Sequence, residues 1–265
     1  MKAIIFFLMI MVNIPSFSQN VDSVGYLSLL KGNGLCIRKG IETNLKIPFY
    51  FLNGDRIKMN TGNAVVVLFS EEEVQINKGE SRTLAYNKLN KSKNSDLLMY
   101  MNTKQSNSSF KIRGIADPKV KIFPLKSKII DPSLVTIHVK SQSEKHTKYF
   151  FKLMKFQSQE VVYQLSDSKS DSIKLQFAPI EKGTNYIWKI KYPEYEITGE
   201  LSALSDDQIR HIPKFTFSSR ASYMEAYNYY YKELLIFEAY KTIKNAIKAY
   251  PDDMYFEYIK SNMFW

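Results

Sequence analysis

The chain has few of the residues from which catalytic and metal sites are usually built. Its 265 residues include one cysteine, Cys36, so no disulfide can form within it. The three histidines, His138, His146 and His211, lie far apart, and none has a second ligand at a spacing typical of zinc sites. The chain also lacks a glycine-rich phosphate loop and a Gly-x-Ser-x-Gly elbow. We therefore expect no catalytic residue, metal or cofactor, a structural role for His138, and a buried, unreactive thiol at Cys36.

Long apolar runs are missing beyond the N-terminal region, so no later segment is a transmembrane candidate. Residues 3–12 form an unbroken apolar stretch that is short for a bilayer span. Small residues follow at Ser16 and Ser18, the positions that precede a signal-peptidase cut before Gln19. The pattern predicts a signal peptide over residues 1–18 and an exported protein, periplasmic or envelope-associated, without an integral membrane segment after cleavage. An uncleaved anchor helix is the alternative.

The charge of the chain is basic but dispersed. The formal net charge is +11, and the lysines are scattered along the sequence rather than clustered. This pattern favours a solvated lysine-rich surface over a nucleic-acid site, and no nucleic-acid partner is expected. The paired carboxylates at 206–207 and 252–253 stand beside expected turns or helix starts, where capping explains them.

Residues 19–86 read as a small all-β domain of short strands separated by glycines. At its centre, Asn53 and Gly54 predict a tight turn with positive φ at Gly54, and Asp55 can accept hydrogen bonds from neighbouring amides. We assign these three residues a structural role. The apolar run at 64–69 and the alternation at 74–77 predict two further strands.

This segment resembles the FecR-type β domain of bacterial envelope proteins. The motif of that family places a Gly-Asp pair after a leucine and before an "Ala, any, Val, any, Leu" strand. The matching residues are Gly32, Arg38, Leu52, Gly54, Asp55, Ile57, Ala64, Val66 and Leu68. The chain departs from the pattern at 71–73, where the family usually has an Asp-Gly turn. The resemblance implies an envelope protein. In that family the domain senses an outer-membrane receptor, but the anti-sigma segment which that role requires is not recognised here.

Residues 87–109 are rich in Asn, Ser and Lys and predict a polar linker. Residues 110–217 then return to short strands, as in a β-sandwich. The spacing of Tyr186, Trp188 and Ile190 places all three on one face of a strand, where we expect core residues rather than a sugar-binding platform. Together with Gly183 they resemble late strands of immunoglobulin-like envelope modules.

Residues 218–265 change to helical periodicity and predict three short helices, with Ser218 or Ser219 as the first N-cap. The helices are expected to reach about residue 233, to span 236–250, and to run from 254 to about 263. Four residues of this tail, Ala239, Ile243, Ala246 and Pro251, resemble the second helix of a tetratricopeptide repeat. One such repeat cannot bury its own apolar faces.

The apolar face of this helical tail must therefore be covered. It can dock on the sandwich, or it can recruit a partner, and the resemblance to an interaction repeat favours recruitment. The residues assigned to that surface are Tyr223, Tyr227, Phe237, Tyr240 and Ile247.

The sequence as a whole predicts a mainly β protein with a C-terminal α-helical segment. We expect a non-enzymatic binding or scaffold module whose partner is an envelope protein or a cell-wall polymer. The alternative is a carbohydrate- or peptidoglycan-modifying enzyme, which would need two carboxylates converging in a cleft. The sequence makes no prediction about oligomeric state.

Overall fold

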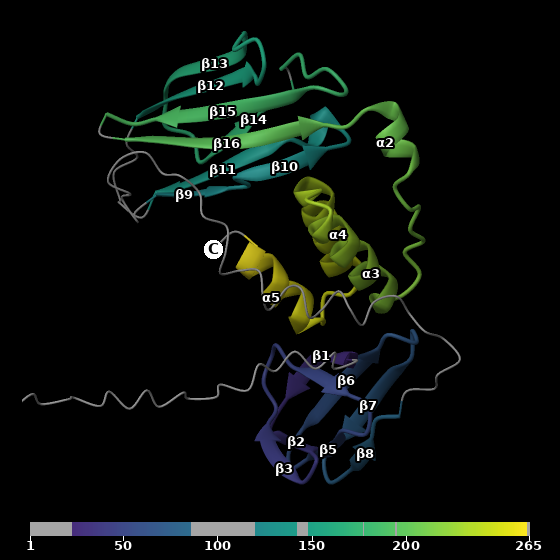
Figure 1. Cartoon of the computed structure of the whole chain (residues 1–265). Helices are drawn as coiled ribbons and strands as arrows, with labels where there is room; N and C mark the ends of the chain where they lie inside the picture. Colours follow the sequence, from purple (N-terminus) through teal and green to yellow (C-terminus); the bar gives the residue numbers. More distant parts are fainter. Residues whose placement is uncertain (1–22, 86–119, 142–147, 177, 194, 264–265) are drawn as a thin grey trace, which may run out of the picture.

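The computed structural model describes residues 23–85, 120–141, 148–176, 178–193 and 195–263. The predicted signal peptide at 1–18 and the predicted linker at 87–109 lie outside these residues. Two β units lie at opposite ends of the molecule, and a group of helices lies between them (Figure 1). The chain is mainly β with C-terminal helices, as the sequence predicts.

The N-terminal β unit consists of two antiparallel four-stranded sheets, in the orders β4-β1-β6-β7 and β3-β2-β5-β8. Its strands are β1 (Ser23–Lys31), β2 (Gly34–Arg38), β3 (Ile41–Asn44), β4 (Tyr50–Leu52), β5 (Arg56–Met59), β6 (Asn63–Leu68), β7 (Glu73–Asn77) and β8 (Ser81–Thr83). Exposed and buried residues alternate along β5 and β7, because one face of each strand lines the core between the sheets. Strand β1 differs, since six consecutive residues in it are buried.

Two glycines hold the turns of this unit close together. Gly62 has a φ of +70°, and a Cβ at this position would collide with the backbone carbonyl oxygen of Lys31. Gly32 has a φ of +97° and lies against the backbone of Thr61 in the same way. A side chain at either position would therefore be strained and would also push the two turns apart.

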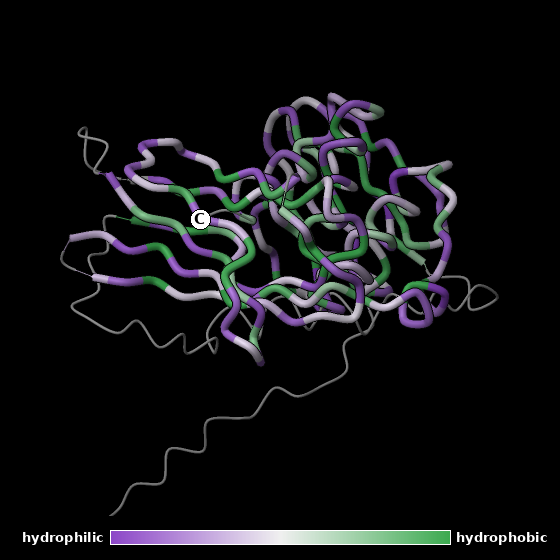
Figure 2. The backbone as a smooth tube through the Cα atoms, turned by 90° about the horizontal axis from the view of Figure 1, so that it is seen from above, coloured by the Kyte–Doolittle hydropathy of each residue, from purple (hydrophilic) through white to green (hydrophobic). Residues whose placement is uncertain are grey.

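The second β unit is a sandwich of a five-stranded and a three-stranded sheet, in the orders β10-β16-β15-β12-β13 and β14-β11-β9. Strand β10 pairs in parallel with β16, and the other pairs are antiparallel. The strands are β9 (Val120–Phe123), β10 (Lys126–Ile129), β11 (Thr136–Ser141), β12 (Tyr149–Lys155), β13 (Val161–Ser168), β14 (Ser172–Lys174), β15 (Asn185–Lys191) and β16 (Glu196–Ala203). Apolar and polar residues alternate along them (Figure 2).

The core of the sandwich is built as the alternation of β15 predicts. Tyr186, Trp188 and Ile190 are fully buried in it. Gly199 on β16 makes room for the indole, because a Cβ there would overlap the ring of Trp188. These three residues are core residues, so they form no platform on the surface.

Four helices follow the sandwich: α2 (Asp206–Arg210), α3 (Arg220–Lys232), α4 (Ile236–Ala249) and α5 (Met254–Met263). The three longer helices lie where the sequence predicts them. Ser219 caps α3 and accepts a hydrogen bond from the backbone of Ser222 at 3.2 Å. The short helix α2 was not expected. It begins with a capping box formed by Ser205 and Gln208. No described helix is long and apolar enough to cross a membrane.

Helices α3, α4 and α5 pack on both β units. Their core includes Tyr26, Val67 and Phe69 of the N-terminal unit, together with Tyr255 and Phe256 of α5. Phe237, at the start of α4, is buried instead in the core of the sandwich. The helical segment therefore fills the space between the units, and β1 is buried on both faces because α5 covers its outer side.

Candidate functional site

The junction between α5 and the N-terminal unit is organised by one buried carboxylate. Asp253 Oδ1 accepts hydrogen bonds from the backbone N–H of Tyr255 at 2.9 Å and of Phe256 at 3.1 Å, and so caps α5. Asp253 Oδ2 accepts a hydrogen bond from Ser28 Oγ on β1 at 2.6 Å. Burial raises the pKa of Asp253 to about 6. One side chain thus starts a helix and anchors it to a strand.

Arg220, the first residue of α3, joins three segments at the edge of this junction. Its Nη1 donates to both carboxylate oxygens of Glu73 on β7, at 2.8 and 2.6 Å, and its Nη2 donates to Asp252 at 2.9 Å. Its Nε lies 3.3 Å from Asp253 Oδ2, which is an ion-pair distance, but makes no hydrogen bond with it. The guanidinium also lies 4.5 Å from the ring centre of Tyr250. The arginine side chain is only 11% exposed, whereas its partners Glu73 and Asp252 are 40% and 59% exposed.

A second junction joins the start of α4 to β10 of the sandwich. The backbone N–H of Lys128 donates to the carbonyl oxygen of Leu234 at 2.8 Å, and the backbone N–H of Ile236 donates to Ser127 Oγ at 3.2 Å. Glu238 is buried close to the backbone of Ile130. Burial raises the pKa of Glu238 to about 7, and its Oε2 has no hydrogen-bond partner among the described residues.

The two buried carboxylates of raised pKa lie in different junctions. Asp253 holds α5 to β1, and Glu238 lies in the first turn of α4 against the sandwich. Each therefore has a positioning role in the fold. Among the described residues, no group of three His, Cys, Asp or Glu side chains is arranged to hold a metal ion.

The residues assigned from the sequence to a partner-binding surface lie mostly inside the molecule. Tyr227 is buried in the core of the helical segment, and Phe237 is buried in the core of the sandwich. Tyr223, Tyr240 and Ile247 are half-buried against the helical core. The assignment of Tyr227 and Phe237 to an exposed surface is therefore corrected, and that of the half-buried Tyr223, Tyr240 and Ile247 stays a prediction. The apolar faces of the helices pack on the two β units, and the sequence did not reveal the N-terminal unit as a docking surface.

The predicted turn at 53–55 is present, and its last residue also forms an ion pair. Gly54 has a φ of +86°, the conformation that the Asn53–Gly54 pair predicts, and a Cβ there would meet nothing within 4 Å. Asp55 accepts a hydrogen bond from the backbone of Leu52 at 2.7 Å. It also accepts hydrogen bonds from Arg38 Nε at 2.9 Å and from Arg38 Nη2 at 2.7 Å. The Asp55 carboxylate is buried, so the turn also anchors a partly buried ion pair.

Cys36 lies in the core of the N-terminal unit, as its apolar neighbours predict. Burial, followed by the nearby charge of Asp55, raises the pKa of the thiol to about 12. The thiolate is the reactive form of cysteine, and at neutral pH almost none of it is present.

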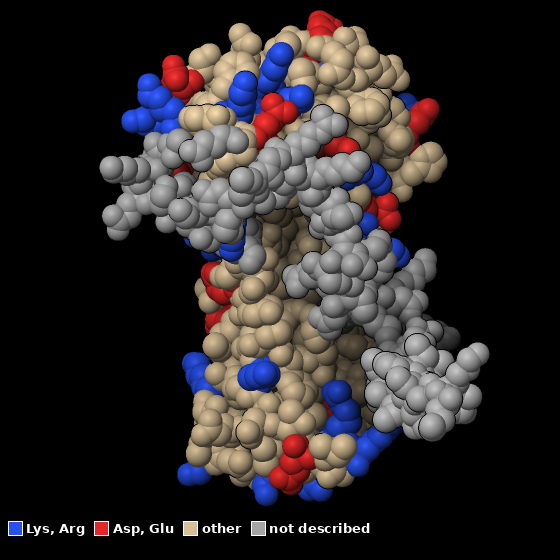
Figure 3. All heavy atoms as spheres, turned by 60° about the vertical axis from the view of Figure 1, so that its left-hand side comes forward, with Lys and Arg blue, Asp and Glu red and all other residues tan. Residues whose placement is uncertain are grey.

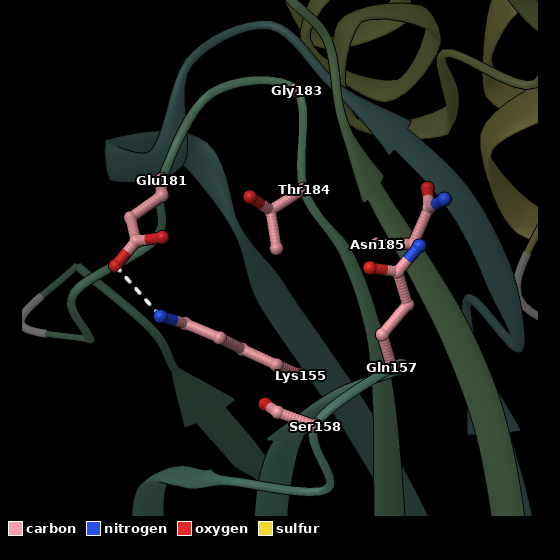
Figure 4. A pocket seen from close by; sticks show the side chains of 7 residues that line it. All are labelled: Lys155, Gln157, Ser158, Glu181, Gly183, Thr184 and Asn185. Carbon is pink, nitrogen blue, oxygen red and sulfur yellow. Dashed lines mark hydrogen bonds and ion pairs between the residues drawn. The ribbon is translucent and has the colours of Figure 1, made fainter.

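Two hollows lie on the surface of the sandwich and its helical neighbour. One, of about 320 Å³, is lined by the apolar residues Leu204, Ile212 and Leu235 and by the Lys128–Glu233 ion pair, among others. Its volume is near the lower end for small-molecule sites, and it lies between the sandwich and α3. The other, of about 230 Å³, has a polar lining and lies between the β12–β13 turn and the segment before β15 (Figure 4). Neither hollow was foreseen, because each is lined by residues distant in sequence.

Charged side chains do not single out one surface. On the face shown in Figure 3, Lys and Arg are spread over both ends of the molecule and are interspersed with Asp and Glu. This distribution agrees with the dispersed lysines of the sequence, and it gives no basic patch on that face.

Comparison with known proteins gives a partial structural match and no family. No protein-family model and no curated protein matches the chain. One solved structure with partial similarity is a DUF3244 family protein from Bacteroides vulgatus, described as an immunoglobulin-like β-sandwich. It is 16% identical, with a TM-score of 0.25, and the match covers 34% of this chain and 92% of that protein.

Proposed function

We propose that this chain is an exported, non-enzymatic scaffold or binding protein of the cell envelope. In this proposal the helical segment holds the two β units in a fixed relative arrangement, and the units present their outer loops and sheet edges to a partner. The partner is an envelope protein or a cell-wall polymer.

The observation that carries the proposal is that one helical segment packs on both β units, with α5 on the outer face of β1 and Phe237 of α4 in the core of the sandwich. Tyr255 and Phe256 pack with Tyr26 of β1, and the ring centres of Tyr26 and Tyr255 are 4.7 Å apart. Phe237, only 18 positions before Tyr255 in the sequence, belongs to the core of the sandwich. Aromatic contacts of this kind dominate the energetics of buried interfaces, so separating the units would expose large apolar surfaces.

The assignment to the envelope is supported by sequence features. The apolar stretch at 3–12, followed by Ser16 and Ser18, has the form of a signal peptide. The N-terminal unit resembles FecR-type domains, the sandwich resembles immunoglobulin-like envelope modules, and α4 resembles a tetratricopeptide helix. These resemblances favour a binding function over catalysis.

Cell fractionation and affinity capture test the proposal together. The chain should be recovered from the envelope or periplasm with an N-terminus at or near Gln19, and intact Met1 in a cytoplasmic fraction would contradict export. The mature chain, immobilised, should then retain a specific protein or glycan from envelope extracts.

A pair of variants tests whether the fixed arrangement matters for capture. Asp253→Ala removes the buried anchor of α5, whereas Asp252→Ala changes the neighbouring carboxylate, whose side chain is 59% exposed. We expect capture to weaken in the first variant and to persist in the second. Equal capture by both variants, with α5 shown to be displaced in the first, would argue against a scaffold.

A further inference from the structure

The polar hollow of the sandwich is formed by two neighbouring turns. The β12–β13 turn contributes Lys155, Gln157 and Ser158, and the segment leading into β15 contributes Glu181 and Thr184. Figure 4 shows the Lys155 side chain extending across the space between the turns toward Glu181, with the Thr184 side chain facing the same space. The volume of about 230 Å³ is small and suits one compact polar group rather than a large cofactor.

The backbone around this hollow is held in place by hydrogen bonds. The N–H of Phe156 donates to the carbonyl of Asn185 at 2.8 Å, and this bond ties the two turns together. The N–H of Glu181 donates to the hydroxyl oxygen of Tyr186 at 2.7 Å, so the second turn is attached to a core residue. The N–H of Ala203 donates to the carbonyl of Thr184 at 2.9 Å. A ligand would therefore meet a preformed site and need not order the loops.

Three of the six polar side chains that line the hollow are uncommitted. Gln157, Thr184 and Asn185 make no side-chain hydrogen bond to any other residue in the described part of the chain. An amide both donates and accepts hydrogen bonds, and so does a hydroxyl. The three side chains together can serve a ligand that carries several groups of the same mixed character.

The charges at the hollow select against an anionic ligand. Lys155 Nζ lies 2.9 Å from Glu181 Oε1 and 3.2 Å from Glu160 Oε2, and these hydrogen bonds raise the pKa of Lys155. Its positive charge is thus already matched by carboxylates. An added anion would meet the Glu181 carboxylate, and the ammonium group beside it is already paired. A neutral ligand with many hydroxyl groups avoids this repulsion.

We propose that this hollow binds a neutral sugar unit of a glycan. Sugar hydroxyls both donate and accept hydrogen bonds, as do the side chains of Gln157, Thr184 and Asn185. The Lys155–Glu181 pair supplies one more donor and one more acceptor at the opposite side. The inference rests on the proposed function as a binding protein and names the class of ligand. The sugar can be an N-acetylhexosamine of a cell-wall glycan or a plain hexose of another polysaccharide.

Calorimetric titration of the full-length mature chain with three trisaccharides tests the proposal and separates the two sources. The probes are chitotriose, an N-acetylhexosamine glycan, maltotriose, a hexose glycan, and trigalacturonate, which is charged. We expect at least one neutral probe to bind with a dissociation constant on the order of 1 mM or below, as suits a single sugar site. Trigalacturonate should bind about ten-fold more weakly. A preference for chitotriose identifies the cell-wall source, and a preference for maltotriose the other.

Two substitutions locate the site. Thr184→Val removes the hydroxyl but keeps the shape, and Gln157→Ala removes the amide; each should weaken binding about five-fold, the effect of one hydrogen bond. The matched control is Gln164→Ala, an exposed glutamine on β13 outside the hollow, which should leave affinity unchanged. Absence of binding to both neutral probes at about 10 mM, unchanged affinity in both variants, or tighter binding of trigalacturonate would each overturn the proposal. If the sugar-binding test fails while envelope capture succeeds, the sugar proposal is wrong and the scaffold proposal stands. If capture fails as well, both proposals are wrong.

Discussion

Ser28 and Asp253 are 225 positions apart in the sequence, and their side-chain oxygens lie 2.6 Å apart. The hydrogen bond joins β1 to the residue that caps α5, since the other oxygen of Asp253 accepts two backbone N–H groups of that helix. The start of the last helix is thereby fixed on the first strand. This contact and the burial of Phe237 in the sandwich are the two ends of the helical connection between the β units.

Replacing Asp253 should weaken the fold more than replacing its neighbour. Asp253→Ala removes a helix cap and a buried hydrogen bond, and we expect the free energy of unfolding to fall by about 2 kcal/mol. Asp252→Ala removes an exposed ion pair with Arg220 and should cost less than about 1 kcal/mol. Urea denaturation of the full chain at neutral pH measures both. A cost for Asp252→Ala that equals or exceeds that of Asp253→Ala would show that the anchor is misassigned.

Stability should also depend on pH through Asp253. Its pKa is about 6 in the folded protein and near the ordinary value of 3.8 when unfolded. Below about pH 4 the carboxyl is protonated in both states, and between about pH 4 and 6 only the unfolded state loses the proton. The contribution of this group to stability is therefore lost as pH rises through that window. The difference in unfolding free energy between the wild type and Asp253→Asn should fall from pH 4 to pH 7. A flat or rising difference contradicts the assignment.

A related prediction concerns Glu238, at the junction between α4 and the sandwich. Burial raises its pKa to about 7, and one carboxylate oxygen has no described partner, so the ionised form is disfavoured in the folded state. Glu238→Gln should raise the free energy of unfolding at pH 8 by on the order of 1 kcal/mol, and the gain should shrink as pH falls from about 7 to 4.5. The control Glu225→Gln, an exposed position on α3, should change stability by less than about 0.5 kcal/mol at either pH. A loss of stability at pH 8 would mean that the charged form of Glu238 is needed.

At the turn formed by residues 53–55, the structure changes the expected cost of replacing Asp55. From the turn alone, Gly54→Val should cost about 1–3 kcal/mol through its positive φ, and Asp55→Ala about 1 kcal/mol. The structure keeps the first expectation but raises the second to about 2–3 kcal/mol, because Asp55 is buried and pairs with Arg38. Gly54→Asn is the matched control, since asparagine tolerates this conformation. Thermal unfolding of the full chain compares all three. Equal stability of Asp55→Ala and the wild type would rule out a structural role for the ion pair.

Local patterns in the sequence were sufficient for most of the elements. The alternation of Tyr186, Trp188 and Ile190 predicted a core strand, and the caps and periodicity after Ser219 predicted three helices. Helix α2 was missed because it has only five residues, although Ser205 and Gln208 have the spacing of a capping box. The run at 64–69 also indicates how its strand is buried. It is apolar without alternation, which indicates a strand buried on both faces, and in the structure Val66 and Val67 belong to different cores.

The packing of distant segments could not be predicted in the same way. Tyr26 and Tyr255 are in contact although almost the whole sequence separates them, and neither local sequence indicates the other residue as its partner. The same holds for the pairing of Arg38 with Asp55 and for the polar hollow, where Lys155 meets Glu181. A single sequence gives the faces of each element that must be buried, and the tertiary structure decides what covers them.

The central claim is that the helical segment is bound to the N-terminal β unit, and a double-mutant cycle across Ser28 and Asp253 tests it most directly. Unfolding free energies are measured for the full-length wild type, Ser28→Ala, Asp253→Asn and the double variant. Because the two side chains share a buried hydrogen bond, the account predicts a coupling energy of about 1 kcal/mol, with the double variant less destabilised than the sum of the single ones. Effects that add to within about 0.3 kcal/mol would contradict the claim, because residues that do not touch behave additively.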